Sequence, residues 1–126
     1  MKKKTVILEI YDKIIDFYLG TEKEIYEILD KYACPRECKR TFRGFCRPQK
    51  GFKGIDIFIN VSIPGQDDKR TFIEVSTILV HEIRHAVDKI TEHLGIDDTE
   101  SAAYMTGYIY SKLFPVVLEE YEILAK

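Results

Sequence analysis

The chain has 126 residues, of which 45% are hydrophobic and 32% are charged, a composition typical of one globular domain with one core. The formal net charge of -2 argues against a strong nucleic-acid binder, and no apolar run approaches the roughly 20 residues that cross a bilayer. The apolar run Val6–Leu8 behind the N-terminal lysines is too short for a signal peptide, so we expect a cytoplasmic protein with no membrane partner.

Basic and acidic residues are unevenly distributed along the chain. Residues 1–60 contain 13 Lys and Arg against 9 Asp and Glu, whereas residues 61–126 contain 6 against 12. Much of the basic excess lies between Arg36 and Lys53. A solvated surface is the simplest interpretation of such a segment, and a docking surface for an acidic partner is the alternative.

Three cysteines, Cys34, Cys38 and Cys46, lie in or beside this basic segment. An odd number of cysteines without a secretion signal favours free thiols over disulfides. A structural zinc site normally has four ligands, often as paired C-x-x-C units, whereas this segment offers three thiols at wider spacing and no nearby histidine. We therefore expect partly buried, inert thiols.

The first predicted elements form a β-hairpin. Two runs rich in β-branched and aromatic residues, Val6–Tyr11 and Ile14–Leu19, flank Asp12 and Lys13. This pattern predicts two strands joined by a two-residue turn.

A helix is predicted to follow the hairpin. Thr21 and Glu24 form the pattern of a capping box, and apolar residues at helical spacing continue the helix to Tyr32. The basic, cysteine- and glycine-containing stretch 34–53 then predicts a loop or an irregular pair of strands.

Residues 54–63 show a strict two-residue period. Apolar side chains occupy every second position, namely Ile55, Ile57, Ile59, Val61 and Ile63. This alternation predicts a strand with one buried face, and the stretch from Pro64 to Asp68 predicts a loop after it.

A long helix is predicted next. Thr71 and Glu74 form a second capping box, and apolar spacing continues the helix to about His93. Gly95 suits the position directly after the helix end.

The C-terminal part predicts two shorter helices. Asp98 or Thr99 caps the first, Pro115 interrupts it near Phe114, and a last amphipathic helix follows. Strands dominate the first half and helices the second, which indicates one α+β domain covering residues 1–126.

The long predicted helix contains His81-Glu82-Ile83-Arg84-His85, the H-E-x-x-H pattern of zinc metalloproteases. Two histidines four residues apart lie one above the other on a helix, so both imidazoles can bind one tetrahedral zinc ion. Glu82 is rotated about 100° around the helix axis from His81, where it can reach a metal-bound water. The alternative is a polar helix face with no metal. It is weakened because the helix is apolar on almost every side, and burying these polar groups without partners would be costly.

A catalytic zinc ion takes three protein ligands and a water, so a third ligand is needed. Asp88 lies on the same helix as the histidines, and three ligands from one straight helix cannot easily surround a tetrahedral ion. His93 is roughly 18 Å from His81 by helix rise. Glu100 lies on the next helix after the turn at Gly95, so we predict it as the third ligand and keep Asp88 and His93 as alternatives.

Small residues on the predicted face of Glu100 support this choice. Ala103 and Gly107 would let the two helices approach closely, and Tyr104 would face the site beside them. We therefore place Tyr104 with Glu82 as a catalytic residue. The donor to the oxyanion is left open among four side chains, namely Tyr104, Tyr108, Arg84 and His93.

The segments Val80–Asp88 and Thr99–Tyr104 together resemble a minimal gluzincin metallopeptidase. The resemblance implies a zincin-like fold, with a small mixed or antiparallel sheet packed on the active-site helix. It implies that His81, His85 and Glu100 hold zinc and that Glu82 is the general base. The strand at residues 54–63 resembles the edge strand that lines the cleft and binds the substrate backbone in that family.

One position departs from the thermolysin-like pattern. Those gluzincins carry an Asp four residues after the ligand Glu, where this chain has Tyr104. Asp88, three residues after His85, would then orient a zinc-bound histidine instead.

The sequence thus predicts a zinc-dependent hydrolase that cleaves peptide bonds in a peptide or protein substrate. Zinc would activate a water, and Glu82 would take its proton. One alternative is a non-catalytic zinc-binding adaptor or inhibitor. Another is a binder of an acidic partner or nucleic acid through residues 36–53, with zinc only stabilising the fold.

Overall fold

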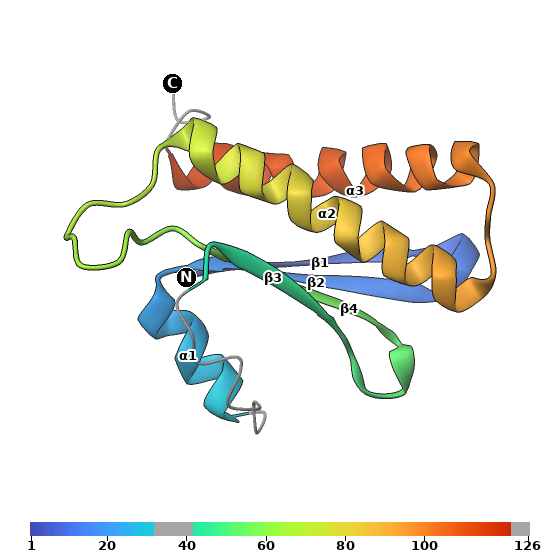
Figure 1. Ribbon diagram of the computed structural model, residues 1–126, viewed down its shortest axis with the longest axis horizontal. Helices are drawn as coiled ribbons and strands as arrows, with labels where there is room; N and C mark the ends of the chain where they lie inside the picture. Colours follow the sequence, from blue (N-terminus) through green and yellow to red (C-terminus); the bar gives the residue numbers. More distant parts are fainter. Residues whose placement is uncertain (32–41, 122–126) are drawn as a thin grey trace.

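The computed structural model describes residues 1–31 and 42–121, and in this part of the chain it shows a mixed α+β fold with a four-stranded sheet and three α-helices (Figure 1). The elements in chain order are β1 (Lys2–Leu8), β2 (Lys13–Gly20), α1 (Glu22–Lys31), β3 (Gly44–Pro48), β4 (Gly54–Asn60), α2 (Phe72–Leu94) and α3 (Thr99–Glu120). Two short 3-10 turns, Glu9–Tyr11 and Lys50–Phe52, complete them. The predicted α+β class is therefore confirmed.

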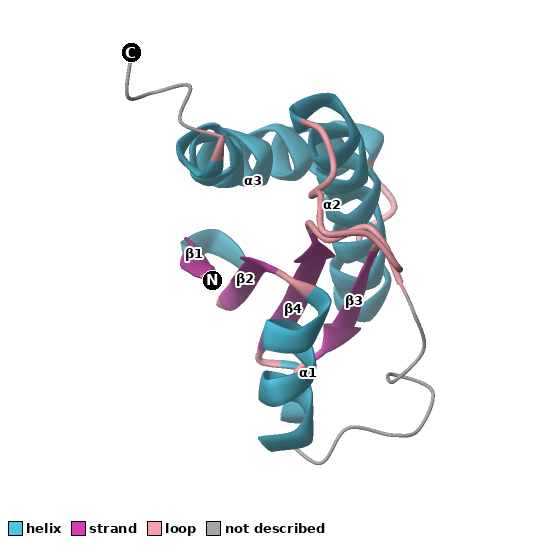
Figure 2. Cartoon of the chain, turned by 90° about the vertical axis from the view of Figure 1, so that its left-hand side faces the viewer, coloured by secondary structure: helices cyan, strands magenta, loops and turns pink. Residues whose placement is uncertain are grey.

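The strand order in the sheet is β1-β2-β4-β3. The central pair, β2 and β4, is parallel, and the two outer pairs are antiparallel. Helices α2 and α3 cover one face of the sheet, and α1 lies against the other (Figure 2).

The predicted hairpin is present, but its connection is longer than two residues. Leu8 of β1 pairs with Lys13 of β2, so residues 9–12 form the connection. It consists of a 3-10 turn that ends at Asp12, whose φ of 51° is left-handed. The preference of Asp for local backbone hydrogen bonding makes that conformation accessible.

Strand β4 is buried on both faces, whereas the alternation predicted one buried face. All seven of its residues are buried. The isoleucines face α2 and α3, and Phe58 on the other face stacks between Tyr18 and Phe45. Ile25 and Leu29 of α1 complete this smaller aromatic cluster. The alternation of apolar residues along β4 thus did not reveal that α1 covers the second face of the strand.

The position of β4 also corrects the expectation that residues 54–63 form an edge strand beside the site. β4 is an inner strand, and the edge strand that packs against α2 is β3. At the start of β4, Gly54 passes so close to β2 that an added Cβ would lie 2.0 Å from the Ile14 carbonyl oxygen. Glycine is therefore required for the central strands to meet here.

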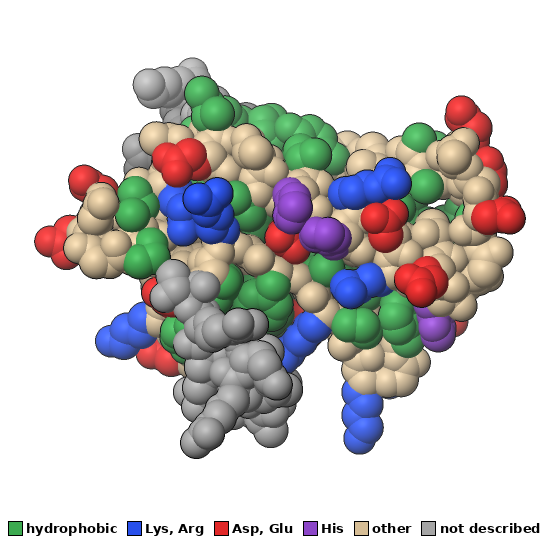
Figure 3. Space-filling view, viewed as in Figure 1, with side chains coloured by type: hydrophobic (Ala, Val, Ile, Leu, Met, Phe, Trp, Pro, Cys, Tyr) green, Lys and Arg blue, Asp and Glu red, His purple; other side chains and the backbone are tan. Residues whose placement is uncertain are grey.

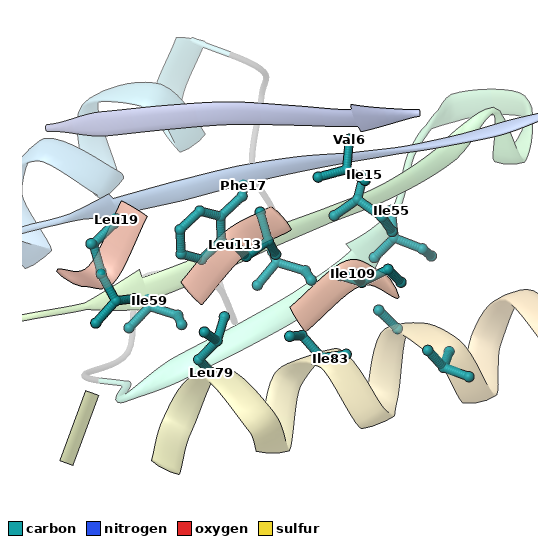
Figure 4. Packing of buried hydrophobic residues seen from close by; sticks show 14 of the residues in the cluster. Val6, Ile15, Phe17, Leu19, Ile55, Ile59, Leu79, Ile83, Ile109 and Leu113 are labelled. Carbon is teal, nitrogen blue, oxygen red and sulfur yellow. The ribbon is translucent and has the colours of Figure 1, made fainter. Parts of the chain in front are cut away.

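The main core lies between the sheet and the helix pair (Figure 4). It includes Ile15 and Phe17 from β2, Leu79 and Ile83 from α2, and Ile109 from α3, all fully buried. This contact fixes the rotation of α2 about its axis, and with it the direction of every other side chain on the helix.

Both predicted capping boxes are confirmed. The Thr21 amide donates to Glu24 Oε1 at 2.9 Å, and Thr71 and Glu74 exchange the equivalent pair of hydrogen bonds. Gly95, whose φ of 70° is left-handed, caps the C-terminal end of helix α2. Asp98 caps the start of α3, and its side chain accepts from the amides of the first turn.

The predicted break at Pro115 is wrong, because α3 continues through Pro115 to Glu120. A proline removes one hydrogen bond from the helix interior. Here Leu113 and Val117 on either side of it are fully buried, so tertiary packing holds the helix together. No helix in the described part of the chain combines the length and apolarity that a membrane crossing demands.

The capping box of α2 gives a test of this local structure. We expect Thr71→Ala to lower the free energy of unfolding by about 1 kcal/mol, because it removes the side-chain acceptor for the Glu74 amide. Thr77→Ala is the matched control on the same helix. Its hydroxyl only donates back to the Ile73 carbonyl, so its loss should change stability little. Urea unfolding of both variants makes the comparison, and equal losses would contradict the capping role.

Candidate metal and hydrolase site

His81 and His85 lie side by side on the outer face of α2. Their Nε2 atoms are 3.0 Å apart, and both residues are exposed. In Figure 3 neighbouring histidine side chains lie near the middle of this face of the molecule. The spacing of four residues has therefore brought the two rings together, as the sequence predicts.

Glu82 points inward from the same turn of the helix. Only 5% of this residue is exposed, and its Oε2 lies 4.0 Å from His81 Nε2. Burial raises the pKa of the Glu82 carboxyl, and the charges of His81, His85 and Lys89 partly oppose that rise. Among the described residues, its one ion-pair contact is with the His81 ring. The site thus combines a buried carboxylate with two accessible imidazoles.

Gly44 at the start of β3 makes room for this arrangement. An added Cβ would lie 2.8 Å from Ile78 Cγ2 and 3.2 Å from Glu82 Cγ. The edge strand can pack directly against this turn of α2 because residue 44 has no side chain. Sequence reasoning missed Gly44, since nothing near it in the chain indicates that it meets α2.

Cys46, two residues further along β3, is a second neighbour that the sequence did not connect to the site. Burial, reinforced by the negative charge of Glu82, raises the pKa of its thiol to about 11. At neutral pH the thiol is protonated and weakly reactive. This agrees with the expectation of an inert thiol at Cys46, whereas Cys34 and Cys38 lie outside the described residues.

The structure does not bring a third candidate ligand to the two histidines. Asp88 is paired with Arg84, whose Nε lies 3.2 Å from its Oδ1. The His93 ring stacks on Phe52 with centroids 4.0 Å apart. Glu100 is exposed in the first turn of α3. Over residues 1–31 and 42–121, no three His, Cys, Asp or Glu side chains form a group that could hold a metal ion.

The expected orientation of α3 is wrong. Ala103 and Gly107 were expected to face α2, but both are exposed, and an added Cβ at Gly107 would meet nothing within 4 Å. The helix packs through Met105 and Ile109 instead. Because residues 101–111 carry no charge on any side, the sequence offered no polar face that would fix the rotation.

Tyr104 consequently lies away from the histidines. Its side chain is 68% exposed and lines a cavity together with Ile10 and Tyr11 at the end of the β1–β2 hairpin. Tyr108 lines the same cavity. Of the four side chains considered as oxyanion donors, Arg84 is the one within a turn of both histidines on α2.

The basic segment is described from residue 42 onward. Arg43 is exposed before β3, whereas Arg47 pairs with Asp56 at 3.2 Å. Among its described residues this stretch contains one strand, β3, which pairs antiparallel with β4 beyond it, so the expected pair of strands within the stretch is not what forms. Residues 36–40 lie outside the described part.

No protein-family profile, curated protein sequence or solved structure matches the chain.

The proximity of Cys46 to Glu82 gives a chemical test of the site. Removing the Glu82 charge in Glu82→Gln should lower the pKa of the Cys46 thiol from its value of about 11, because like charges no longer repel. In metal-free protein, alkylation of Cys46 by iodoacetamide should therefore begin at a lower pH than in wild type. Mass spectrometry of the Cys46 peptide resolves it from the other two cysteines. Alkylation of native Cys46 near pH 8.5, as for a free thiol, would contradict the buried placement.

Proposed function

We propose that the chain is a zinc-dependent hydrolase that cleaves peptide bonds, with His81 and His85 as zinc ligands and Glu82 as general base. The observation that carries the proposal is the placement of two adjacent, exposed imidazoles beside a buried carboxylate, whose Oε2 lies 4.0 Å from His81 Nε2. A structural zinc site has no need for such a carboxylate, so this feature supports catalysis over a purely structural metal.

The two histidines suit a zinc ion as a ligand pair. Two nitrogen ligands at zinc-bond length on a tetrahedral ion lie about 3.3 Å apart. The Nε2 atoms of His81 and His85, at 3.0 Å, are close to that separation. Their exposure leaves room for a substrate to reach the same point.

The environment of Glu82 suits a general base. A buried carboxyl with a raised pKa holds a proton more readily than an exposed one, which helps it to accept a proton from water and then release it to a leaving amine. When bound, zinc would supply Lewis acidity, which acidifies a water and polarises a carbonyl group. Glu82 takes up and delivers the proton, and the two histidines hold their positions through the rigid turn of α2 between them.

We retain Glu100 as the proposed third ligand, with Asp88 and His93 as the alternatives. Leu94, the last residue of α2, lies about 14 Å along the helix from His85 by helix rise. Coordination by Glu100 would therefore require the N-terminal end of α3 to move toward the histidines.

Two other functions compete with hydrolysis. A non-catalytic zinc-binding adaptor or inhibitor would use the histidines without needing Glu82. A binder of an acidic partner would use the basic segment, where Arg43 is exposed. The adaptor or inhibitor is favoured over hydrolysis only if the loss of the Glu82 carboxylate changes the stability of the protein and none of its activities.

The roles of the histidines and Glu82 can be separated by experiment. The purified wild type should bind about one zinc ion per chain by elemental analysis. Glu82→Gln should keep the zinc but reduce cleavage of a fluorogenic peptide library by about 10²- to 10⁴-fold. Glu92→Gln, an exposed change on the same helix, is the matched control and should cleave as wild type does. Cleavage by Glu82→Gln at the wild-type rate would refute the general base, and a wild type that takes up no zinc would refute the metal.

The third ligand requires a side-by-side comparison. Zinc affinity should fall most in Glu100→Ala if that carboxylate completes the site, and thermal stability in zinc should fall with it by linkage. Asp88→Ala and His93→Ala serve as the alternatives in the same buffer. Wild-type zinc binding by Glu100→Ala, together with a collapse in either of the others, would remove Glu100 from the site.

A further inference from the structure

A second cavity, outside the proposed zinc site, lies between β1 and α3. Its volume is about 390 Å³, and it is lined by residues 2–4 of β1 and by Lys112, Pro115, Val116 and Glu119 of α3. The three other α3 residues follow Lys112 by three, four and seven positions, so all four share one face of the helix. Cavities of roughly 300–1,000 Å³ are typical of small-molecule sites. This cavity is therefore large enough for a small ligand.

Strand β1 runs antiparallel to α3 along this cavity. At one end, Lys2 Nζ lies 3.3 Å from Glu119 Oε1. At the other end, Leu8 and Met105 line a neighbouring cavity together. The distance between the two ends is roughly 20 Å whether it is counted by strand rise or by helix rise. Positions along β1 can therefore be matched to positions along α3.

Lys4 and Lys112 lie beside the same part of the cavity. Lys4 is about 7 Å along β1 from Lys2, and Lys112 is about 10 Å along α3 from Glu119, so the two are only about 4 Å out of step. The alternation of β1 turns Lys4 to the same face as Val6, which packs in the core beneath the helices. Both side chains have flexible four-carbon stems, so their ammonium groups can meet at one ligand group.

The cavity carries two lysine charges that the protein does not neutralise. Glu119 pairs with Lys2, and Lys3 leaves the strand on the other face of the sheet. Within residues 1–31 and 42–121, neither Lys4 nor Lys112 makes an ion pair. The whole chain has a net charge of -2, so this local excess is opposite in sign to the rest of the protein. A concave surface with charges of one sign concentrates ions of the other sign, here an anion.

Protection of a strand edge is the alternative explanation for these lysines. β1 is an edge strand, and lysines on such a strand discourage its pairing with another chain. This explains residues 2–4 but not Lys112, which lies on α3. Lys112 Nζ is 5.5 Å from the centre of the Tyr108 ring, a contact that holds the ammonium group beside the cavity. Edge protection thus leaves Lys112 and the cavity unexplained.

We propose that this cavity binds a small organic phosphomonoester, with its phosphate between Lys4 and Lys112. Above its second pKa of about 6, a phosphomonoester carries a charge of about -2, which matches the two unpaired lysines. A dicarboxylate would carry that charge on two separate groups, whereas the two lysines can meet at a single one. Pro115 and Val116 supply an apolar surface for the organic part. The proposal does not rest on the zinc-hydrolase proposal.

Titration of the untagged protein with three probes, followed by amide chemical shifts in NMR, tests the site. The buffer is at about pH 8 with about 0.1 M salt, which screens charges further apart than roughly 10 Å. Phenyl phosphate should shift the amides of residues 2–4 and 112–119. Phenyl sulfate, which has the same shape and one negative charge fewer, should bind about fivefold more weakly. Inorganic phosphate, which lacks the apolar part, should also bind more weakly than phenyl phosphate.

Three results of this titration would overturn the proposal. The first is no saturable binding of phenyl phosphate at millimolar concentrations. The second is equal affinity for phenyl phosphate and either of the other two probes. The third is a set of shifts centred on residues 43–53, which would place the anion on the basic segment instead.

Substitutions test the two lysines separately. Lys4→Gln and Lys112→Gln should each weaken phenyl phosphate binding by about fivefold, and Lys112→Arg, which keeps the charge, should bind better than Lys112→Gln. Lys23→Gln, which removes an exposed lysine of α1, is the matched control and should bind as wild type does. The substituted residues are exposed, so all four variants should unfold at the wild-type temperature without ligand. Wild-type binding by Lys4→Gln and Lys112→Gln, or an equal loss in Lys23→Gln, would overturn the proposal. If edge protection is the whole role of the β1 lysines, Lys4→Gln will aggregate more readily and bind phenyl phosphate no differently.

Discussion

The rotation of α2 about its own axis decides what the molecule can do with its histidines. Leu79, Ile83 and Ile90 are fully buried against the sheet and α3, and this stripe sets the helix at one angle. At that angle Glu82 points toward β3, while His81 and His85 point to solvent. A rotation by one residue, about 100°, would either turn Glu82 to the exposed direction of His81 or turn both histidines to the buried directions of Glu82 and Ala86.

The edge strand β3 holds the same geometry from the other side. Gly44 allows β3 to lie against α2 at the turn that carries Glu82. Cys46 then lies close enough for the negative charge of Glu82 to raise the pKa of its thiol. The burial of Glu82 thus depends on a contact between residues nearly 40 positions apart in the chain. On an isolated helix of this sequence the Glu82 carboxylate would be solvated, and burial would not raise its pKa.

The features that the sequence predicted are local ones. Capping boxes at Thr21 and Thr71, the helix end at Gly95 and the convergence of two histidines all depend on neighbours within about one or two turns. The features that it missed depend on distant packing. The alternation in β4 could not show that α1 covers its second face, because that requires the position of α1.

The same distinction explains why the candidate site was only partly predictable. His81, Glu82 and His85 come from one turn-and-a-half of a helix, so their relative placement follows from helix geometry. A third ligand for the proposed zinc ion would have to come from elsewhere, and the position of Glu100 depends on how α3 is rotated. The uncharged stretch in α3 carries no pattern to set that rotation, and the buried stripe through Met105 and Ile109 appeared only in the structure.

The parallel pairing at the centre of the sheet has a consequence for how the chain folds. The β1–β2 hairpin is local, but β2 finds its other partner, β4, about 40 residues later in the chain. A loop of that length must close before β2 and β4 can pair, and closing it costs conformational entropy. This pairing therefore forms more slowly than local structure does. As the chain emerges during synthesis, the edge of β2 that later pairs with β4 therefore stays unpaired until β4 has emerged. During that interval the hydrogen-bonding groups on this edge of β2 are open to a strand of another chain, and such pairing leads to aggregation.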